Sequence, residues 1–479
     1  MKIQIVLLLI LSSFSGLTRA QTTCSCRDAL QNIIFKIESE YPGFDVKIKD
    51  RLLYDSFKEN MVKAAIGNNN PAECLEVLKS YTGFFKDRHI WVLPNEAEHK
   101  QIGNAGTNSH PGRNRANINL KKFKAQATKI TNEIEGIWKD EKYEVGIKKL
   151  NANEYIGFII KADPNFWKPD EIKFRLFSDG SYEYYMQDRS VQKGKYTIDN
   201  GGLLFFDTIR SAFIRQIPFA HLKPSQIDDK VNEANGFFVK KLTPRTTMVK
   251  MQYFSYMFVD PIEKMLEKNR ELLVNSEFLI IDVRDNGGGT DNAYQKILPY
   301  LVTGPSRTLG VEYLASPTLI STSEKYLLGL KKDTEKNKVE IQDLEKRILQ
   351  LKAKPGKYVI YDNEKIHINS VVPYNNGPSQ IVVLANNHTA SAAENFLLLA
   401  KQSKKTKIIG VPSSGVLDYA NAMFFEYGCD NYKLLMPTYK SFRLPDYPID
   451  NIGIQPDIYL DEGVSNWVEF SVGYLEDTK

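Results

Sequence analysis

A serine stands where an apolar strand is expected to end and a helix to begin. The stretch NNHTASAAENFLLLAKQ, residues 386–402, places Ser391 directly before an amphipathic run, with Glu394 three positions later. This spacing is typical of a capping box at a helix N-terminus. A serine hydroxyl can also act as a nucleophile when a base activates it. The segment alone leaves both interpretations open, a helix cap and a nucleophile.

A glycine-rich turn after another apolar strand is the second candidate for chemistry. The stretch FLIIDVRDNGGGTDNAY, residues 278–294, runs from a strand of buried type into three glycines, Gly287 to Gly289. Without side chains in the way, successive backbone N–H groups can point into one concavity and bind an anion. A phosphate cradle, an oxyanion hole and a flexible turn are the alternatives. A phosphate loop needs a lysine after the glycines, whereas Thr290 and Asp291 follow here.

Several enzyme classes lack their motifs in this chain. It contains no Gly-x-Ser-x-Gly, no His-Glu-x-x-His, no Walker loop and no dinucleotide fingerprint. Its single Cys-x-Cys has no second close cysteine pair and no nearby histidine, which is weak spacing for zinc. We therefore expect neither a metal nor an organic cofactor. An oxyanion hole needs a nucleophile, and Ser391 begins a helix after the next clear core strand.

Four motifs, in this order, resemble those of the tail-specific protease superfamily of serine peptidases, which includes C-terminal processing proteases, the tricorn core and interphotoreceptor retinoid-binding proteins. They are LIIDVRDNGGG, ANNHTASAAENF, KIIGVPSSG and YPIDNIGIQPD, within residues 246–460. The resemblance implies a crotonase-like α/β core with an added helical cap. It also implies that Ser391 is the nucleophile and that the N–H groups of Gly288 and Ala392 form the oxyanion hole, with Gly289 as the neighbouring candidate.

The superfamily uses two kinds of general base, and this chain resembles only one of the two branches. In the C-terminal processing branch a lysine directly follows a glycine after the nucleophile helix, but here Val416 follows Gly415. The tricorn-like branch uses a histidine from the N-terminal cap, and KDRHIW, residues 86–91, resembles its motif. The resemblance implies His89 as the base. The alternatives are His388 as the base, or His89 as a structural histidine where a strand starts.

A carboxylate that fixes the imidazole tautomer would complete a triad. Asp450, in YPIDNIGIQPD, stands where the tricorn-like branch has a glutamate. Arg88 stands where tricorn has a serine that relays between the acid and the histidine, and Ser441 is an alternative relay. The catalytic residues implied by the resemblance are therefore Ser391, His89 and Asp450.

Three stretches of different sequence pattern must position these residues. Residues 21–122 are mostly of helical pattern and predict an N-terminal helical cap that contains His89. Residues 123–242 contain six short runs of strand pattern and predict a small inserted all-β domain, a barrel or a sandwich. Residues 243–470 alternate between strands and helices and predict the α/β core, with a charged helical insertion at 324–354.

The β-rich region contains a Gly-x-Trp sequence that ends at Trp138 and resembles the motif of lipocalin-like barrels. An aromatic core residue of an ordinary all-β domain is the favoured interpretation. The region does not resemble the PDZ domain with which many relatives bind the C-terminus of a substrate. How a substrate is captured is therefore open.

The N-terminal residues predict export. Residues 1–20 contain an early lysine, a short apolar run and small residues before Gln21, as in a secretory signal peptide, with an uncleaved anchor as the alternative. We expect a periplasmic or extracellular protein with no stable membrane insertion after cleavage. In such an oxidising compartment, Cys24 or Cys26 should pair with Cys74, with four free thiols as the alternative.

Composition and charge do not indicate a nucleic-acid partner. The 479 residues have a net charge of +5, and the densest basic patch, residues 121–129, lacks the interleaved aromatics of a nucleic-acid surface.

Together, the resemblance and the signal-like N-terminus lead us to expect an exported serine endopeptidase that hydrolyses proteins or peptides by a Ser-His(-Asp) mechanism. The alternative is a catalytically inactive ligand- or protein-binding member of the same fold, which the departures at Arg88 and Asp450 would favour.

Overall fold

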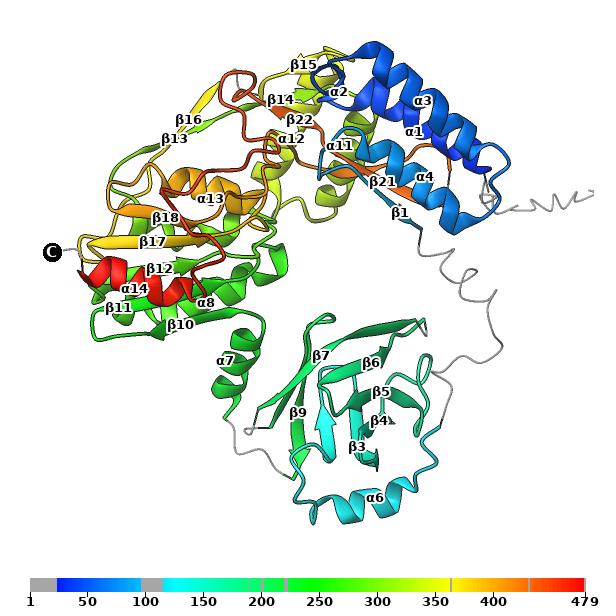
Figure 1. Cartoon of the computed structure of the whole chain (residues 1–479), viewed down its shortest axis with the longest axis vertical. Helices are drawn as coiled ribbons and strands as arrows, with labels where there is room; N and C mark the ends of the chain where they lie inside the picture. Colours follow the sequence, from blue (N-terminus) through cyan, green and yellow to red (C-terminus); the bar gives the residue numbers. More distant parts are fainter. Residues whose placement is uncertain are drawn as a thin grey trace, which may run out of the picture.

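A computed structural model defines the fold (Figure 1). The structure describes residues 24–95, 115–188, 190–199, 202–218, 223–361, 364–429 and 431–477. The predicted signal peptide, residues 1–20, lies outside these residues. Within them, none of the helices combines the length and the hydropathy needed to span a bilayer.

The N-terminal unit is helical, as predicted. Its helices are α1 (Cys26–Glu40), α2 (Phe44–Lys47), α3 (Arg51–Ala65) and α4 (Pro71–Gly83). The side chain of Asn70 accepts hydrogen bonds from the first turn of α4, and Pro71 occupies the first turn, where a missing N–H costs nothing. In α1, Leu30, Ile33 and Ile37 recur at helical spacing and are fully buried.

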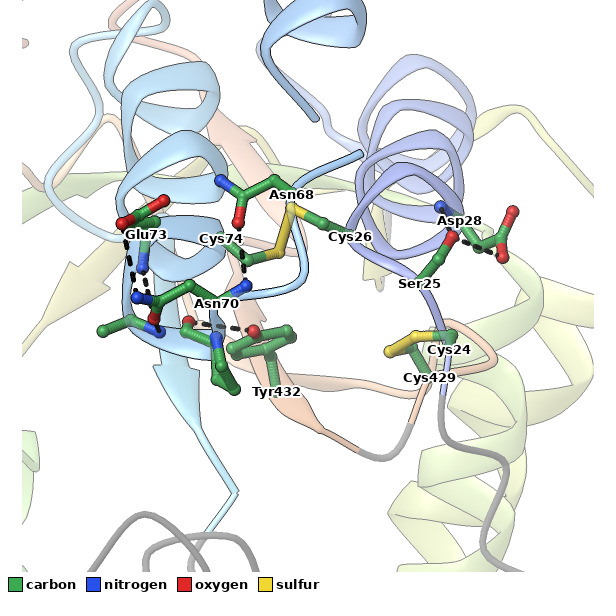
Figure 2. The surroundings of a disulfide bond; sticks show 12 residues. Cys24, Ser25, Cys26, Asp28, Asn68, Asn70, Glu73, Cys74, Cys429 and Tyr432 are labelled. Atoms are coloured by element: carbon green, nitrogen blue, oxygen red, sulfur yellow. Dashed lines mark hydrogen bonds between the residues drawn. A yellow bond between two sulfur atoms is a disulfide. The ribbon is translucent and has the colours of Figure 1, made fainter. Parts of the chain in front are cut away.

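Two disulfides fasten this helical cap (Figure 2). Cys26 pairs with Cys74 and joins α1 to α4, which confirms one of the predicted pairings. Cys24 pairs with Cys429, 405 positions away, which the sequence did not predict. Together the bonds hold the cap both internally and to the C-terminal part of the chain.

A three-stranded sheet lies beneath the cap helices and joins distant parts of the chain. It consists of β1 (Trp91–Pro94), β21 (Tyr432–Met436) and β20 (Met423–Phe425), in that order. One core contains side chains of the cap helices, such as Leu30 and Tyr81, and side chains of this sheet, such as Val92 and Leu434. The cap therefore shares its core with residues that follow the nucleophile helix.

The β-rich region is a closed barrel, which decides between the two predicted architectures. Its eight strands pair in chain order, and the first pairs antiparallel with the last. They are β2 (Gly136–Lys139), β3 (Glu144–Asn151), β4 (Glu154–Lys161), β5 (Ile172–Phe177), β6 (Ser181–Tyr185), β7 (Val191–Asp199), β8 (Leu203–Phe206) and β9 (Ser211–Ile217). The barrel has its own side-chain core, drawn only from residues 116–213. Trp138 is fully buried in that core, and a closed barrel of eight strands paired in chain order is compatible with both interpretations of the Gly-x-Trp sequence.

The α/β core is built on a six-stranded sheet. In spatial order its strands are β10 (Phe237–Lys241), β11 (Thr246–Met251), β12 (Phe278–Asp282), β17 (Gln380–Ala385), β18 (Thr406–Gly410) and β23 (Ile458–Tyr459). All neighbours are parallel except β10 and β11. Helices α8 (Val259–Lys268), α10 (Leu298–Leu301) and α13 (Ala392–Ala400) pack on one face, and α14 (Trp467–Asp477) packs on the other. This arrangement buries the apolar runs of β12 and β17 on both faces.

The remaining elements connect these units. Around the barrel and core they are α6 (Leu120–Ala127), α7 (Pro224–Ala234), η2 (Tyr256–Phe258), α9 (Arg270–Val274) and η3 (Asp291–Tyr294). Short sheets are formed by β13 (Ser306–Leu309) with β16 (Ile366–Asn369), and by β15 (Tyr358–Val359), β14 (Val311–Leu314), β22 (Tyr439–Ser441) and β19 (Tyr419–Ala420). The charged segment after residue 316 forms α11 (Pro317–Leu330), η4 (Lys331–Asp333) and α12 (Lys338–Lys352). Because β12 and β17 are parallel neighbours, the glycine turn and Ser391 lie at the same edge of the sheet.

Candidate active site

Ser391 occupies a strained position between β17 and α13. Its φ and ψ are +55° and −120°, although it is not a glycine. Such a backbone conformation costs about 1 to 3 kcal/mol and is common at functional sites. The Glu394 carboxylate accepts a hydrogen bond from the Ser391 N–H at 3.1 Å, while the Ser391 hydroxyl lies as in a capping box without making a cap hydrogen bond. Ser391 is therefore the helix cap by position, and its hydroxyl is left for other chemistry.

Glu394 organises the loop beside the serine, a role that its place in a capping pattern did not reveal. Its carboxylate is fully buried and also accepts hydrogen bonds from Ser413 Oγ at 2.6 Å, Gly415 N at 2.6 Å and Val416 N at 3.1 Å. The position that holds a lysine in the C-terminal processing branch is thus occupied by Val416, bound through its backbone. Glu394 fixes this loop against the first turn of α13.

The glycine turn packs directly against Ser391. Gly288 has a φ of +90°, and a Cβ added to it would lie 2.7 Å from Ser391 Cβ and 2.8 Å from Ala392 N. At Gly289, with a φ of +139°, an added Cβ would lie 2.4 Å from the Phe254 carbonyl oxygen. Only glycine fits at either place, which explains two of the three glycines after β12.

The three predicted oxyanion donors differ in their hydrogen bonds. The Gly288 N–H already donates to Asn286 Oδ1 at 2.9 Å, and Asn286 is fully buried. Within the described residues, neither the Gly289 N–H nor the Ala392 N–H donates a hydrogen bond. Of the three predicted donors, Gly289 and Ala392 are therefore the two whose N–H groups are not already hydrogen bonded in the described residues, and Gly288 allows the turn to approach Ser391 closely.

His89 is oriented by a backbone carbonyl. Its Nδ1 lies 2.6 Å from the carbonyl oxygen of Tyr419, which can only accept a hydrogen bond. Nδ1 must therefore have the proton in the neutral ring, which leaves the lone pair on Nε2. No hydrogen bond joins the imidazole to Ser391 in the described part of the chain. The alternative histidine, His388, is exposed, and its backbone N–H donates to Asn386.

In the described residues no hydrogen bond joins Asp450 directly to His89, so the triad contact that the resemblance implies, direct or bridged by water, stays a prediction. The Asp450 carboxylate pairs with Lys47 of α2 and accepts a hydrogen bond from Asn451 Nδ2 at 3.2 Å. Burial raises the pKa of Asp450, and the Lys47 ammonium partly opposes that effect. The docking of α2 brings the Lys47 ammonium to this carboxylate. Asp450 therefore links the cap to the core.

Asp87 is the carboxylate that the structure places next to His89. Its Oδ1 accepts the His89 backbone N–H at 2.8 Å, and its Oδ2 accepts the Tyr41 hydroxyl at 2.6 Å. Burial raises the pKa of Asp87, while the charge of a protonated His89 would lower it. The sequence contained a signal for this role, since an aspartate two residues before a turn residue is typical of a side-chain-to-backbone turn.

In the described residues, no hydrogen bond joins the imidazole to Arg88, at the position of the tricorn relay serine, or to Ser441, the alternative relay. Arg88 donates to Ser414 Oγ at 2.6 Å, and the Ser414 N–H donates to the carbonyl of Thr389 at 2.9 Å, two residues before Ser391. Ser441 is buried, and its hydroxyl accepts the backbone N–H of Arg443 at 3.1 Å. Arg88 thus fastens the His89 segment to the loop beside the nucleophile. In the described residues, no group of three or more His, Cys, Asp or Glu side chains is arranged to hold a metal ion.

Comparison with known proteins agrees with the sequence motifs. A model of peptidase family S41 matches residues 245–460. No curated protein sequence matches the chain significantly. Among solved structures, a putative peptidase from Parabacteroides merdae is 12% identical, with 95% of this chain and 98% of that one covered and a TM-score of 0.43.

Two further structures are similar to the same extent. Mature CPAF is 12% identical, with 91% of this chain and 93% of that one covered and a TM-score of 0.46. The tricorn protease is 12% identical, with 95% of this chain and 37% of that one covered and a TM-score of 0.42. Residues 245–460 are thus similar to peptidase family S41, the tail-specific family of serine peptidases.

Proposed function

We propose that the protein is an exported serine endopeptidase in which Ser391 is the nucleophile and His89 is the general base. The observation that supports this most directly is the packing of Gly288 against Ser391, at the joint edge of β12 and β17. That packing places a turn with unused N–H groups beside a strained serine whose hydroxyl makes no cap hydrogen bond. A plain helix cap requires neither the strain nor the glycines.

The reaction would begin with attack of Ser391 Oγ on the peptide carbonyl. The N–H groups of Ala392 and Gly289 would donate to the carbonyl oxygen as it becomes negatively charged. Each such donor typically contributes a factor of about 10² to 10³ in rate. Water would then attack the acyl-enzyme and release the new C-terminus.

His89 Nε2 would accept the Ser391 proton and then donate it to the leaving amine. The Tyr419 carbonyl holds the ring in the required tautomer, a task that an aspartate performs in a Ser-His-Asp triad. Because Ser391 and His89 are not hydrogen bonded here, the two must approach when substrate binds, as is common in substrate-free peptidases. Asp87, held by Tyr41, would stabilise the imidazolium by its charge.

Export is the second part of the proposal. The signal-like residues 1–20 and two disulfides in the described residues support an oxidising compartment. Sequencing the N-terminus of the protein from its native host tests this directly. We expect a mature chain that begins at Gln21, and a chain that begins at Met1 in the cytoplasm would contradict export.

A fluorophosphonate probe tests the chemistry. We expect the purified full chain to be labelled at a single serine, and peptide mapping should identify Ser391. Ser391→Ala should lose both the label and the hydrolysis of casein by a factor of roughly 10⁴ or more, with unchanged circular dichroism. Parent-like hydrolysis by Ser391→Ala would show that another residue is the nucleophile. An unlabelled and inactive parent would instead favour the binding-protein alternative.

A further inference from the structure

The sheet of β1, β21 and β20 has one buried face and one exposed face. Val92, Leu434 and Phe425 lie opposite one another across the three strands and are buried against the cap helices. Figure 1 shows α1, α3 and α4 on one side of β1 and β21. Because side chains alternate along a strand, their neighbours in sequence point to the other face.

The exposed face has an apolar row. Trp91 lies opposite Leu435, and Leu435 lies opposite Phe424, so the three side chains cross the whole sheet. Trp91 is 50% exposed and Phe424 is 53% exposed, and Leu93, next on the same face of β1, is 40% exposed. Large apolar side chains in a contiguous row on a surface usually mark a binding site. We call Trp91, Leu435, Phe424 and Leu93 the apolar row.

Among the residues that the structure describes, the outer edge of β1 has no partner strand. In the described residues, β1 pairs only with β21. The Asn95 N–H donates to the Asn431 carbonyl at 2.9 Å, and hydrogen-bonded pairs alternate along an antiparallel ladder. The N–H and C=O of Val92 therefore point away from β21, toward the outer edge. Pro94 lies two positions after Val92, so its backbone nitrogen and C=O also point toward the outer edge. Proline has no N–H and is commonly found at such positions in edge strands.

Both features begin at the proposed catalytic histidine. His89 precedes Trp91 by two residues, and the Trp91 indole N–H donates to the Arg88 carbonyl. Arg88 in turn donates a hydrogen bond to Ser414 Oγ. The Ser414 N–H donates to the carbonyl oxygen of Thr389, two residues before Ser391. A chain bound along β1 would thus run next to the residues that perform the reaction.

We infer that β1 and the apolar row form a substrate-binding surface for an extended, unfolded polypeptide segment with apolar residues at alternate positions. The substrate backbone would pair with the N–H and C=O of Val92, and its apolar side chains would lie on Trp91 and its neighbours. Most strands inside a folded protein are already paired with their neighbours, so the surface favours unfolded or flexible segments. This inference rests on the proposed function, because it treats the occupant as substrate.

Matched peptides test the inference. One fluorogenic peptide has valine or leucine at alternate positions, and the other has serine there. For the apolar peptide we expect Trp91→Ala and Phe424→Ala to raise KM about tenfold, in line with the apolar area that would no longer be buried. For the serine peptide the change should be below twofold. Phe35→Ala, which removes a 67% exposed aromatic from α1, is the control and should leave both peptides unaffected.

The backbone pairing has its own test on the unaltered protein. Apolar peptides methylated at one backbone nitrogen at a time cannot donate a hydrogen bond at that position. We expect methylation at one or two alternate positions to raise KM at least fivefold. An equal change in KM at every methylated position would exclude strand pairing.

Fluorophosphonate labelling of Ser391 separates the two levels of proposal. If the probe labels the parent and the variants but both peptides keep parent KM values in Trp91→Ala and Phe424→Ala, the surface is not a substrate site and the proposed function stands. If the parent is neither labelled nor active, the proposed function and this inference fail together.

Discussion

The helical cap and the β-barrel are attached to the rest of the molecule in different ways. The cap shares a core with residues 419–436 and is linked to that part of the chain by the Cys24–Cys429 disulfide. The barrel has a core of its own, and its contacts outside that core are at its surface. One of them is Arg210, whose guanidinium lies 3.7 Å from the centre of the Tyr253 ring.

The difference matches the proposed roles. The cap contains His89, and a base must be held within a fraction of an ångström of its working position. The barrel contributes none of the proposed catalytic residues, and a self-contained core leaves it free to be positioned by a few contacts. We conclude that a shared core fixes the cap where the chemistry requires precision, whereas the barrel does not need such a connection.

The largest expected effect separates the two regions by catalysis. His89→Ala should lower kcat by about 10² to 10⁴, because a general base contributes that much, while circular dichroism and both disulfides stay unchanged. His388→Ala is the matched control and should retain most of the activity. Parent-like turnover by His89→Ala would mean that the cap, like the barrel, contributes no reacting group.

The second prediction concerns the covalent attachment of the cap. Replacing Cys24 and Cys429 by serine should lower the free energy of unfolding by about 2 to 5 kcal/mol. Hydrogen exchange should then become faster in α1 to α4 and β21 while it stays unchanged in the barrel strands. Equal acceleration in the barrel would show that the two regions unfold as one unit.

The third prediction concerns the surface attachment of the barrel. Tyr253 precedes Phe254, whose N–H and C=O bond to Gly288 and Thr290 on either side of Gly289. Arg210→Ala should therefore lower kcat/KM about two- to fivefold, the size of an exposed cation–π contact of about 0.5 to 1 kcal/mol. Arg210→Lys should restore part of the lost kcat/KM. A loss as large as that of His89→Ala would place the barrel within the catalytic unit.

The smallest expected effect is a pH-dependent contact of the cap. Burial alone would raise the pKa of Glu40, but hydrogen bonds from Lys36 and Thr318 outweigh it and lower the pKa below the reference value of 4.5. A lowered pKa means that the ionised carboxylate stabilises the fold above the unfolded pKa and that this stability is lost as the pH falls. Urea unfolding of Glu40→Gln should differ from the parent at neutral pH and converge with it in acid. A constant difference would show that the contact does not depend on charge.

Much of the architecture followed from local pattern. Strands such as β12 and β17 are continuous apolar runs, and the cap helices have apolar residues at helical spacing, so both were predicted. Two barrel strands were missed. β2 has only four residues, and β9 contains Arg215 and Gln216, which obscure its alternation. Closure depends on the pairing of these two strands, and that is why the sequence could not distinguish a barrel from a sandwich.

Prediction of the candidate active site from the sequence was limited in the same way. Ser391 and the glycine turn were predicted because each is a continuous motif that follows a core strand. The ion-pair partner of Asp450 was not predicted. That partner is Lys47, which is 403 residues away in the sequence and meets Asp450 only when the cap docks. The Cys26–Cys74 pair joins neighbouring helices and was predicted, whereas the pairing of Cys24 with Cys429 requires the folded chain. Long-range partners of single polar residues leave no periodic signal in the sequence.

The Cys24–Cys429 bond also makes most of the polypeptide a covalent ring. A protease is exposed to cuts by its own copies, and one cut at any peptide bond between these two cysteines would open the ring without separating the pieces. Under non-reducing electrophoresis such a nicked molecule would run as a single species, and reduction would divide it into fragments. The cap and the core would thus remain in one molecule after a break that would otherwise release the base from the nucleophile.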